Sequence, residues 1–144
     1  MNYLKKFVVW VFAVLSPDYG IYFSIIVKNK VLKWFYPIPE HKYLFVLSAP
    51  YCGSTLLNEI LMSSKNVSVN NVLNSRQYEG QKLPSTTKLM FVKKMRWDIS
   101  YEIDWIHVKK EWLKYWDQTK PVLLEKSPPN IIRAQQIANC FKPA

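Results

Sequence analysis

A short turn in the first half of the chain carries residue types that bind phosphate. The segment Ala49-Pro50-Tyr51-Cys52-Gly53-Ser54-Thr55 follows the apolar run Tyr43–Ser48 and precedes a stretch with helical spacing. Gly53 would let the backbone approach an anion closely, and the first N–H groups of a helix have no partner within it. These groups, the helix dipole and the hydroxyls of Ser54 and Thr55 together predict an anion-binding loop, although either hydroxyl could instead cap the helix.

The loop differs from that of a nucleoside triphosphatase. Such a loop reads G-x-x-x-x-G-K-[ST], in which the lysine reaches the outer phosphates and the hydroxyl holds magnesium. Here Ser54 stands in the lysine position, and no earlier glycine opens the loop. This argues against ATP or GTP hydrolysis, and a P-loop nucleotide or small-molecule kinase is the second enzymatic interpretation.

A second polar motif follows the apolar segment Pro121–Glu125 and reads Lys126-Ser127-Pro128-Pro129-Asn130. Taken alone, it describes a strand end with a surface lysine and a helix N-cap at Ser127. A positioned ammonium group can also stabilise the charge that develops on a departing phosphate, without a metal ion.

The two motifs together resemble the PAPS-dependent sulfotransferase family, where PAPS is 3'-phosphoadenosine 5'-phosphosulfate. The family's loop commonly reads P-[RK]-S-G-[ST]-T, and the matching residues are Pro50, Gly53, Ser54 and Thr55. Tyr51 and Cys52 stand where the family usually has a basic residue and a serine. The second motif, together with Glu125 before it, is similar to the family's E-K-[ST]-P segment at the end of a core strand. The resemblance covers roughly residues 43–144.

The resemblance implies roles for particular side chains. The 5'-phosphosulfate of the donor would be held by Pro50, Tyr51, Cys52, Gly53, Ser54 and Thr55. Lys126 would face the bridging oxygen or the sulfuryl group, and Ser127 would assist from the same loop. The acceptor hydroxyl must lose a proton to a general base. Glu79 lies where some branches carry a catalytic glutamate, with a solvated loop carboxylate as the alternative.

The expected function is therefore transfer of a sulfuryl group from PAPS to a hydroxyl or amine of a carbohydrate, protein or small molecule. By the same resemblance, the elements that bind the 3'-phosphate and the adenine would follow Ala144. We therefore expect the 144 residues alone to be poorly active. A non-catalytic anion-binding fragment is a further alternative. Arg133 could meet an anion, although exposure on a helix surface is the simpler expectation.

Apolar segments of strand length alternate with segments of helical spacing. The expected strands are Tyr43–Ser48, Val67–Val69, Lys88–Lys93 and Pro121–Glu125, and the expected helices are Ser54–Ser63, Tyr101–Asp117 and Asn130–Asn139. Such alternation predicts an α/β fold with a parallel sheet, a P-loop NTPase-like three-layer sandwich that is incomplete at its C-terminus. The remainder of Asn66–Thr87 is expected to be mostly loop. On the first helix, an apolar stripe typical of a core-facing surface is formed by Leu56, Leu57, Ile60 and Leu61.

The first 39 residues are expected to form an apolar, helical segment and a linker, with the sulfotransferase-like domain over residues 40–144. Lys5 and Lys6 precede the apolar run Phe7–Leu15, which is too short to span a bilayer as a helix. Residues 3–27 could pack on the domain or associate with a membrane surface. A Golgi-type signal anchor is the alternative to a cytoplasmic or membrane-associated protein.

The overall charge and the cysteine and histidine content limit the kinds of ligand that the chain is expected to bind. The net charge of +10 indicates either an anionic partner or lysines that merely keep the chain soluble. The sequence has no block of five like charges, so a nucleic-acid-binding tail is not expected. No metal is expected, because the cysteines and histidines do not have the spacing of a metal site. They are Cys52, Cys140, His41 and His107.

Overall fold

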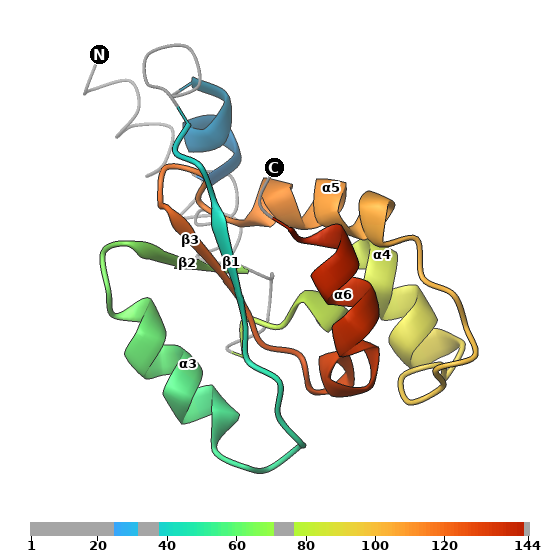
Figure 1. Cartoon of the computed structure of the whole chain (residues 1–144). Helices are drawn as coiled ribbons and strands as arrows, with labels where there is room; N and C mark the ends of the chain where they lie inside the picture. Colours follow the sequence, from blue (N-terminus) through green and yellow to red (C-terminus); the bar gives the residue numbers. More distant parts are fainter. Residues whose placement is uncertain (1–24, 32–37, 71–76, 143–144) are drawn as a thin grey trace, which may run out of the picture.

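The computed structural model describes residues 25–31, 38–70 and 77–142. At its centre lies a parallel sheet of three strands, β1 (Lys42–Phe45), β3 (Val122–Glu125) and β2 (Val67–Val69), in that spatial order (Figure 1). Phe45 lies opposite Glu125 at the carboxyl end of β1, and Val69 lies opposite Leu124. The α/β class and the parallel sheet are thus confirmed.

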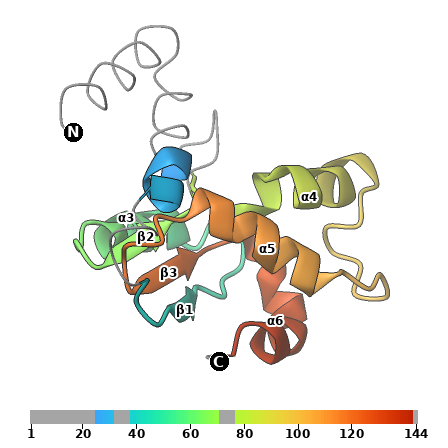
Figure 2. The same cartoon turned by 90° about the horizontal axis from the view of Figure 1, so that it is seen from above.

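Helices lie on both sides of the sheet (Figures 1 and 2). On one side is α3 (Ser54–Met62), and on the other are α4 (Pro84–Thr87), α5 (Trp105–Tyr115) and α6 (Ala134–Cys140). Shorter turns are the 3-10 helices η1 (Gly80–Lys82) and η3 (Pro128–Arg133) and the π-helix η2 (Lys88–Val92). The last predicted helix therefore begins as a 3-10 helix and becomes α-helical only at Ala134.

Alternation along β3 divides the core in two. Leu123 packs into a large cluster with the aromatic side chains of α5, whereas Leu124 packs with Val67 and Val69 on the opposite face. In the large cluster, the rings of Trp112 and Trp116 meet edge to face with centroids 5.8 Å apart. The cluster on the α3 side of the sheet is much the smaller of the two, so this side offers α3 little apolar surface to pack against.

Of the apolar stripe of α3, only Leu61 packs against the core, beside Val67 and Val69, so the expectation is wrong for its other three residues. Leu56, Leu57 and Ile60 are exposed, whereas Ser54 and Asn58 are buried. Thr55, on the same side of the helix, accepts a hydrogen bond from a side chain at the end of β3. Because positions three and four apart share a helix face, this contact directs the polar face inward and these three exposed residues outward.

The predicted strand Lys88–Lys93 is also wrong, because these residues continue the helical path of α4 as η2. Pro84 begins that path at a position where a missing N–H costs nothing. The adjacent residues Leu89 and Met90 are both buried in the large cluster. A strand would send neighbouring side chains to opposite faces, so helical backbone is needed to bury both.

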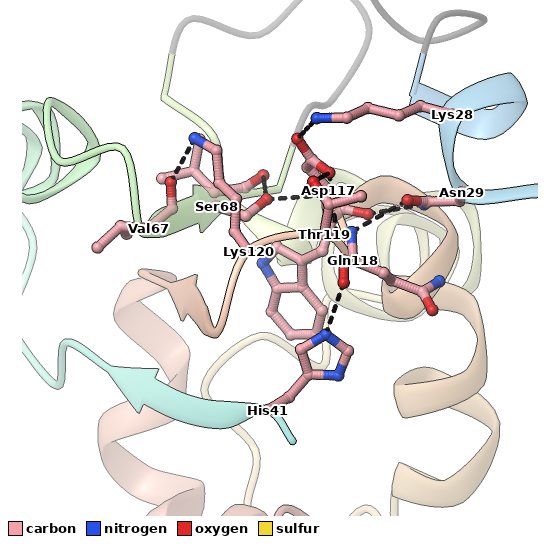
Figure 3. Close-up of polar contacts among 11 residues, drawn as sticks. Lys28, Asn29, His41, Val67, Ser68, Asp117, Gln118, Thr119 and Lys120 are labelled. Atoms are coloured by element: carbon pink, nitrogen blue, oxygen red, sulfur yellow. Dashed lines mark hydrogen bonds and ion pairs between the residues drawn. The ribbon is translucent and has the colours of Figure 1, made fainter. Parts of the chain in front are cut away.

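A helix over residues 25–31 is fixed to the turn between α5 and β3 (Figure 3). Asn29 Nδ2 donates to the Trp116 carbonyl at 2.8 Å, and the Gln118 N–H donates to Asn29 Oδ1 at 3.0 Å. Lys28 forms an ion pair with Asp117. Part of the predicted N-terminal segment thus packs on the α/β unit.

The apolar run Phe7–Leu15 lies outside the described residues. The same holds for residues 3–24 of the predicted membrane-associated segment 3–27. Within the described part of the chain, no helix is long and apolar enough to cross a membrane.

Candidate functional site

The loop between β1 and α3 turns sharply at two positions of positive φ. Gly53, with φ of 81°, is the N-cap of α3, and Tyr51 has φ of 63° with a fully exposed side chain. No side chain caps α3, so neither Ser54 nor Thr55 does so and that alternative is wrong. The first N–H groups of α3 are therefore left uncapped by side chains, as an anion site at a helix start requires.

The remaining loop residues differ in exposure. Pro50 and Cys52 are exposed, and the Cys52 thiol donates to the Ala49 carbonyl at 2.9 Å. Ser54 is buried and Thr55 is half-buried. The Ser48 hydroxyl, at the start of the loop, is buried beside the Cys52 thiol, and a hydrogen bond between these side chains lowers the pKa of Cys52.

Lys126 lies at the carboxyl end of β3 and is only 1% exposed. Its Nζ donates to Thr55 Oγ1 at 3.2 Å and to Glu79 Oε1 at 2.7 Å. The three residues come from three separate segments of the chain. The surface-lysine alternative is wrong, because the ammonium group is enclosed by the first turn of α3 and the segment that leads into η1.

Glu79 is buried beside Lys126, so a solvated loop carboxylate is wrong for this position. Its second oxygen, Oε2, accepts a hydrogen bond from Gln81 Nε2. Both carboxylate oxygens are thus held by cationic or amide donors. A buried carboxylate needs such partners, because burial without them is costly.

Glu125 belongs to the same buried group of charges, although the sequence analysis gave it no role, and its side chain is fully buried. Its Oε2 accepts from the Gly80 N–H at 2.9 Å and from Asn70 Nδ2 at 2.6 Å. Its Oε1 accepts from Asn130 Nδ2 at 3.2 Å and from the Ser127 hydroxyl. Burial raises the pKa of the Glu125 carboxyl to about 7. Two sequence signals pointed to Glu125, its position at the end of an apolar strand and its match to the glutamate of the E-K-[ST]-P segment.

The four hydrogen bonds of Glu125 join the segments that carry the ion pair. Gly80 directly follows Glu79, and Lys126 directly follows Glu125. Ser127 also accepts from the Gln81 N–H at 3.0 Å. Ser127 does stand at the N-cap position of η3, but its hydroxyl makes no capping bond. Its hydrogen-bonding capacity serves the buried network instead.

Arg133 is buried, so the expected surface position is wrong. Its guanidinium donates to three backbone carbonyls of a nearby loop, those of Met95, Arg96 and Asp98. It therefore binds backbone rather than an anion at the Lys126 site.

The histidines and cysteines do not converge with this site. His41 Nε2 lies 3.0 Å from the Gln118 carbonyl, at the amino end of the sheet (Figure 3). Among residues 25–31, 38–70 and 77–142, no three His, Cys, Asp or Glu side chains are grouped to hold a metal ion.

Comparison with known proteins adds no assignment. No family model matches the chain, and it matches neither a curated protein nor a solved structure. A function must therefore be argued from the geometry around Lys126.

Proposed function

We propose that the chain carries the 5'-phosphosulfate site of a sulfotransferase with a P-loop-like three-layer fold, which transfers a sulfuryl group from PAPS to a hydroxyl or amine acceptor. The observation that carries this proposal is the position of the buried Lys126 ammonium between Thr55 and Glu79. A cation, a helix start and a carboxylate at one place are the groups that sulfuryl transfer requires.

The loop residues fit an anionic donor. Nothing lies within 4 Å of the position that a side chain on Gly53 would occupy, so the backbone there is open to a ligand. The first N–H groups of α3 and the hydroxyl of Thr55 supply neutral donors, and Lys126 supplies the charge. This set suits a phosphosulfate better than a magnesium-bound triphosphate, since Ser54 stands where a nucleoside triphosphatase loop carries its lysine.

Lys126 has donor capacity left for a ligand. An ammonium group carries three N–H donors, and the described residues use two of them, towards Thr55 and Glu79. The third could be donated to the oxygen that links sulfur and phosphorus. There it would stabilise the negative charge that appears when this bond breaks.

PAPS supplies a sulfuryl group on a phosphate leaving group. As the oxygen or nitrogen of the acceptor bonds to sulfur, Glu79 would take the acceptor's proton, and the bond from sulfur to the phosphate oxygen would break. Adenosine 3',5'-bisphosphate and the sulfated acceptor would then be the products. Glu125 would hold the Gly80 N–H, next to Glu79, and the Ser127 hydroxyl, next to Lys126, so that the base and the ammonium keep their separation.

Calorimetry with adenosine 3',5'-bisphosphate tests the site directly. We expect Lys126→Ala to weaken binding at least about tenfold, since a charge-assisted contact is lost. Thr55→Val should weaken it by a smaller factor and disturb the fold less. Lys110→Ala, on the exposed surface of α5, removes the same charge and should leave binding unchanged.

Two results would overturn the proposal. Binding that is equally sensitive to Lys126→Ala and Lys110→Ala, and that falls steeply with salt, would show a diffuse electrostatic surface and favour the anion-binding alternative. Magnesium-dependent consumption of ATP, without transfer of labelled sulfate from PAPS, would favour a kinase.

A further inference from the structure

The loop that precedes α5 is fixed in place by a buried side chain. Arg133 Nη1 donates to the Arg96 carbonyl at 2.9 Å, and Nη2 donates to the carbonyls of Met95 at 2.9 Å and Asp98 at 2.7 Å. Arg133 is 1% exposed. Three bonds from one buried guanidinium define the backbone of this loop, so its outward side chains are presented in a set arrangement.

Four apolar or aromatic side chains point outward from this loop and from η2, which directly precedes it. The exposed fractions are 43% for Phe91, 71% for Val92, 47% for Trp97 and 60% for Ile99. The Arg96 guanidinium lies 5.6 Å from the Phe91 ring centroid and 5.3 Å from that of Trp97. One cation thus bridges both rings and holds them at the same surface. We call residues 88–99 the cationic-aromatic surface.

The charges of this surface have one dominant sign. Its cations are Lys88, Lys93, Lys94 and Arg96, and its one acidic residue is Asp98. The Asp98 carboxylate accepts hydrogen bonds from the N–H and the hydroxyl of Ser100. In both views of the fold the segment after α4 lies across the molecule from α3 (Figures 1 and 2). It is therefore separate from the exposed leucines of that helix.

We propose that the cationic-aromatic surface docks on an anionic lipid bilayer. Aromatic rings prefer the boundary between headgroups and acyl chains, and lysine and arginine favour anionic headgroups. Val92 and Ile99 decide between a bilayer and a soluble polyanion. Branched apolar side chains gain from insertion among acyl chains, whereas a nucleic acid or sulfated glycan offers them nothing comparable. The surface shares no residue with the segment 3–27 or with the proposed transfer site.

Vesicle co-sedimentation of the whole chain tests the apolar part of the contact. The vesicles would be an equimolar mixture of phosphatidylserine and phosphatidylcholine, with pure phosphatidylcholine for comparison. We expect Val92→Ser with Trp97→Ser to weaken binding to the anionic vesicles roughly tenfold or more. Leu56→Ser with Ile60→Ser removes two apolar side chains of similar exposure from α3 and should leave binding unchanged.

A second pair of variants tests the charges. Lys93→Ala with Lys94→Ala should weaken binding to anionic vesicles by about fivefold per residue at low salt. Lys110→Ala with Lys114→Ala, exposed on α5, removes the same charge and should have a much smaller effect.

The proposal is overturned if the chain does not bind anionic vesicles, or if binding survives the Val92 and Trp97 changes, as it would if residues 3–27 made the contact. It is also overturned if heparin or single-stranded nucleic acid is bound through the lysines with no effect of Val92→Ser. All the substituted side chains are exposed, so each variant is expected to fold. Circular dichroism checks this and so separates lost binding from lost folding.

Discussion

Lys126 and Glu79 form a buried ion pair, with Nζ and Oε1 2.7 Å apart, between the end of β3 and the residue that precedes η1. Neither side chain has more than 5% of its surface exposed. The pair therefore joins stability to the proposed chemistry, because each buried charge compensates the other.

Removing one member of this pair should cost more than removing both. We expect Lys126→Met to lower the free energy of unfolding by about 3–5 kcal/mol, because the Glu79 carboxylate is left buried without its cation. Lys126→Met combined with Glu79→Gln should recover part of that loss. Urea unfolding of the two single variants and the double variant forms the cycle. Strictly additive losses would show that the two charges do not interact.

Stability should fall as the pH rises from about 4.5 to about 7. The pKa of Glu125 is raised from 4.5 to about 7 by burial, so over this range the folded state binds more protons than the unfolded state. The two pKa values correspond to a loss of about 3 kcal/mol across the range. Urea unfolding at several pH values measures the slope. Glu125→Gln should abolish it, and Glu59→Gln, exposed on α3, should not.

The glycines at 53 and 80 should respond differently to alanine. A Cβ on Gly80 would lie 2.6 Å from Trp112 Cζ2 and 2.8 Å from Glu125 Oε2, so Gly80→Ala should cost about 1–3 kcal/mol through overpacking. Gly53→Ala meets no atom within 4 Å and should cost only about 1 kcal/mol, from its positive φ. Thermal unfolding compares them. Equal losses would contradict the close packing of Gly80.

Substituting a leucine of α3 should affect stability much less than substituting a leucine of β3. Leu56→Ser should change the free energy of unfolding by no more than about 0.5 kcal/mol, since Leu56 is 63% exposed. Leu124→Ala, at a fully buried position of the central strand, should cost about 2–5 kcal/mol. Chemical denaturation measures both. A large loss for Leu56→Ser would mean that α3 turns its apolar stripe towards the sheet.

The local elements followed from patterns within short segments. The apolar run around Leu123 and Leu124 predicted β3, and the break at Gly53 predicted the start of α3, because strand and helix signals depend on neighbouring residues. The segment Lys88–Val92 was misread, since a short apolar run carries no period that separates a strand from a buried helical turn.

The tertiary structure decided which side of α3 faces inward and which charges are buried. Periodicity places Leu56 and Ile60 on one helix face but does not say what that face meets. Whether a charged side chain is solvated or buried depends on partners from distant segments. Examples are Lys126 for Glu79 and, for Arg133, the carbonyls of Met95, Arg96 and Asp98. A charged group is buried only where such partners offset the loss of water, and that is a property of the folded chain.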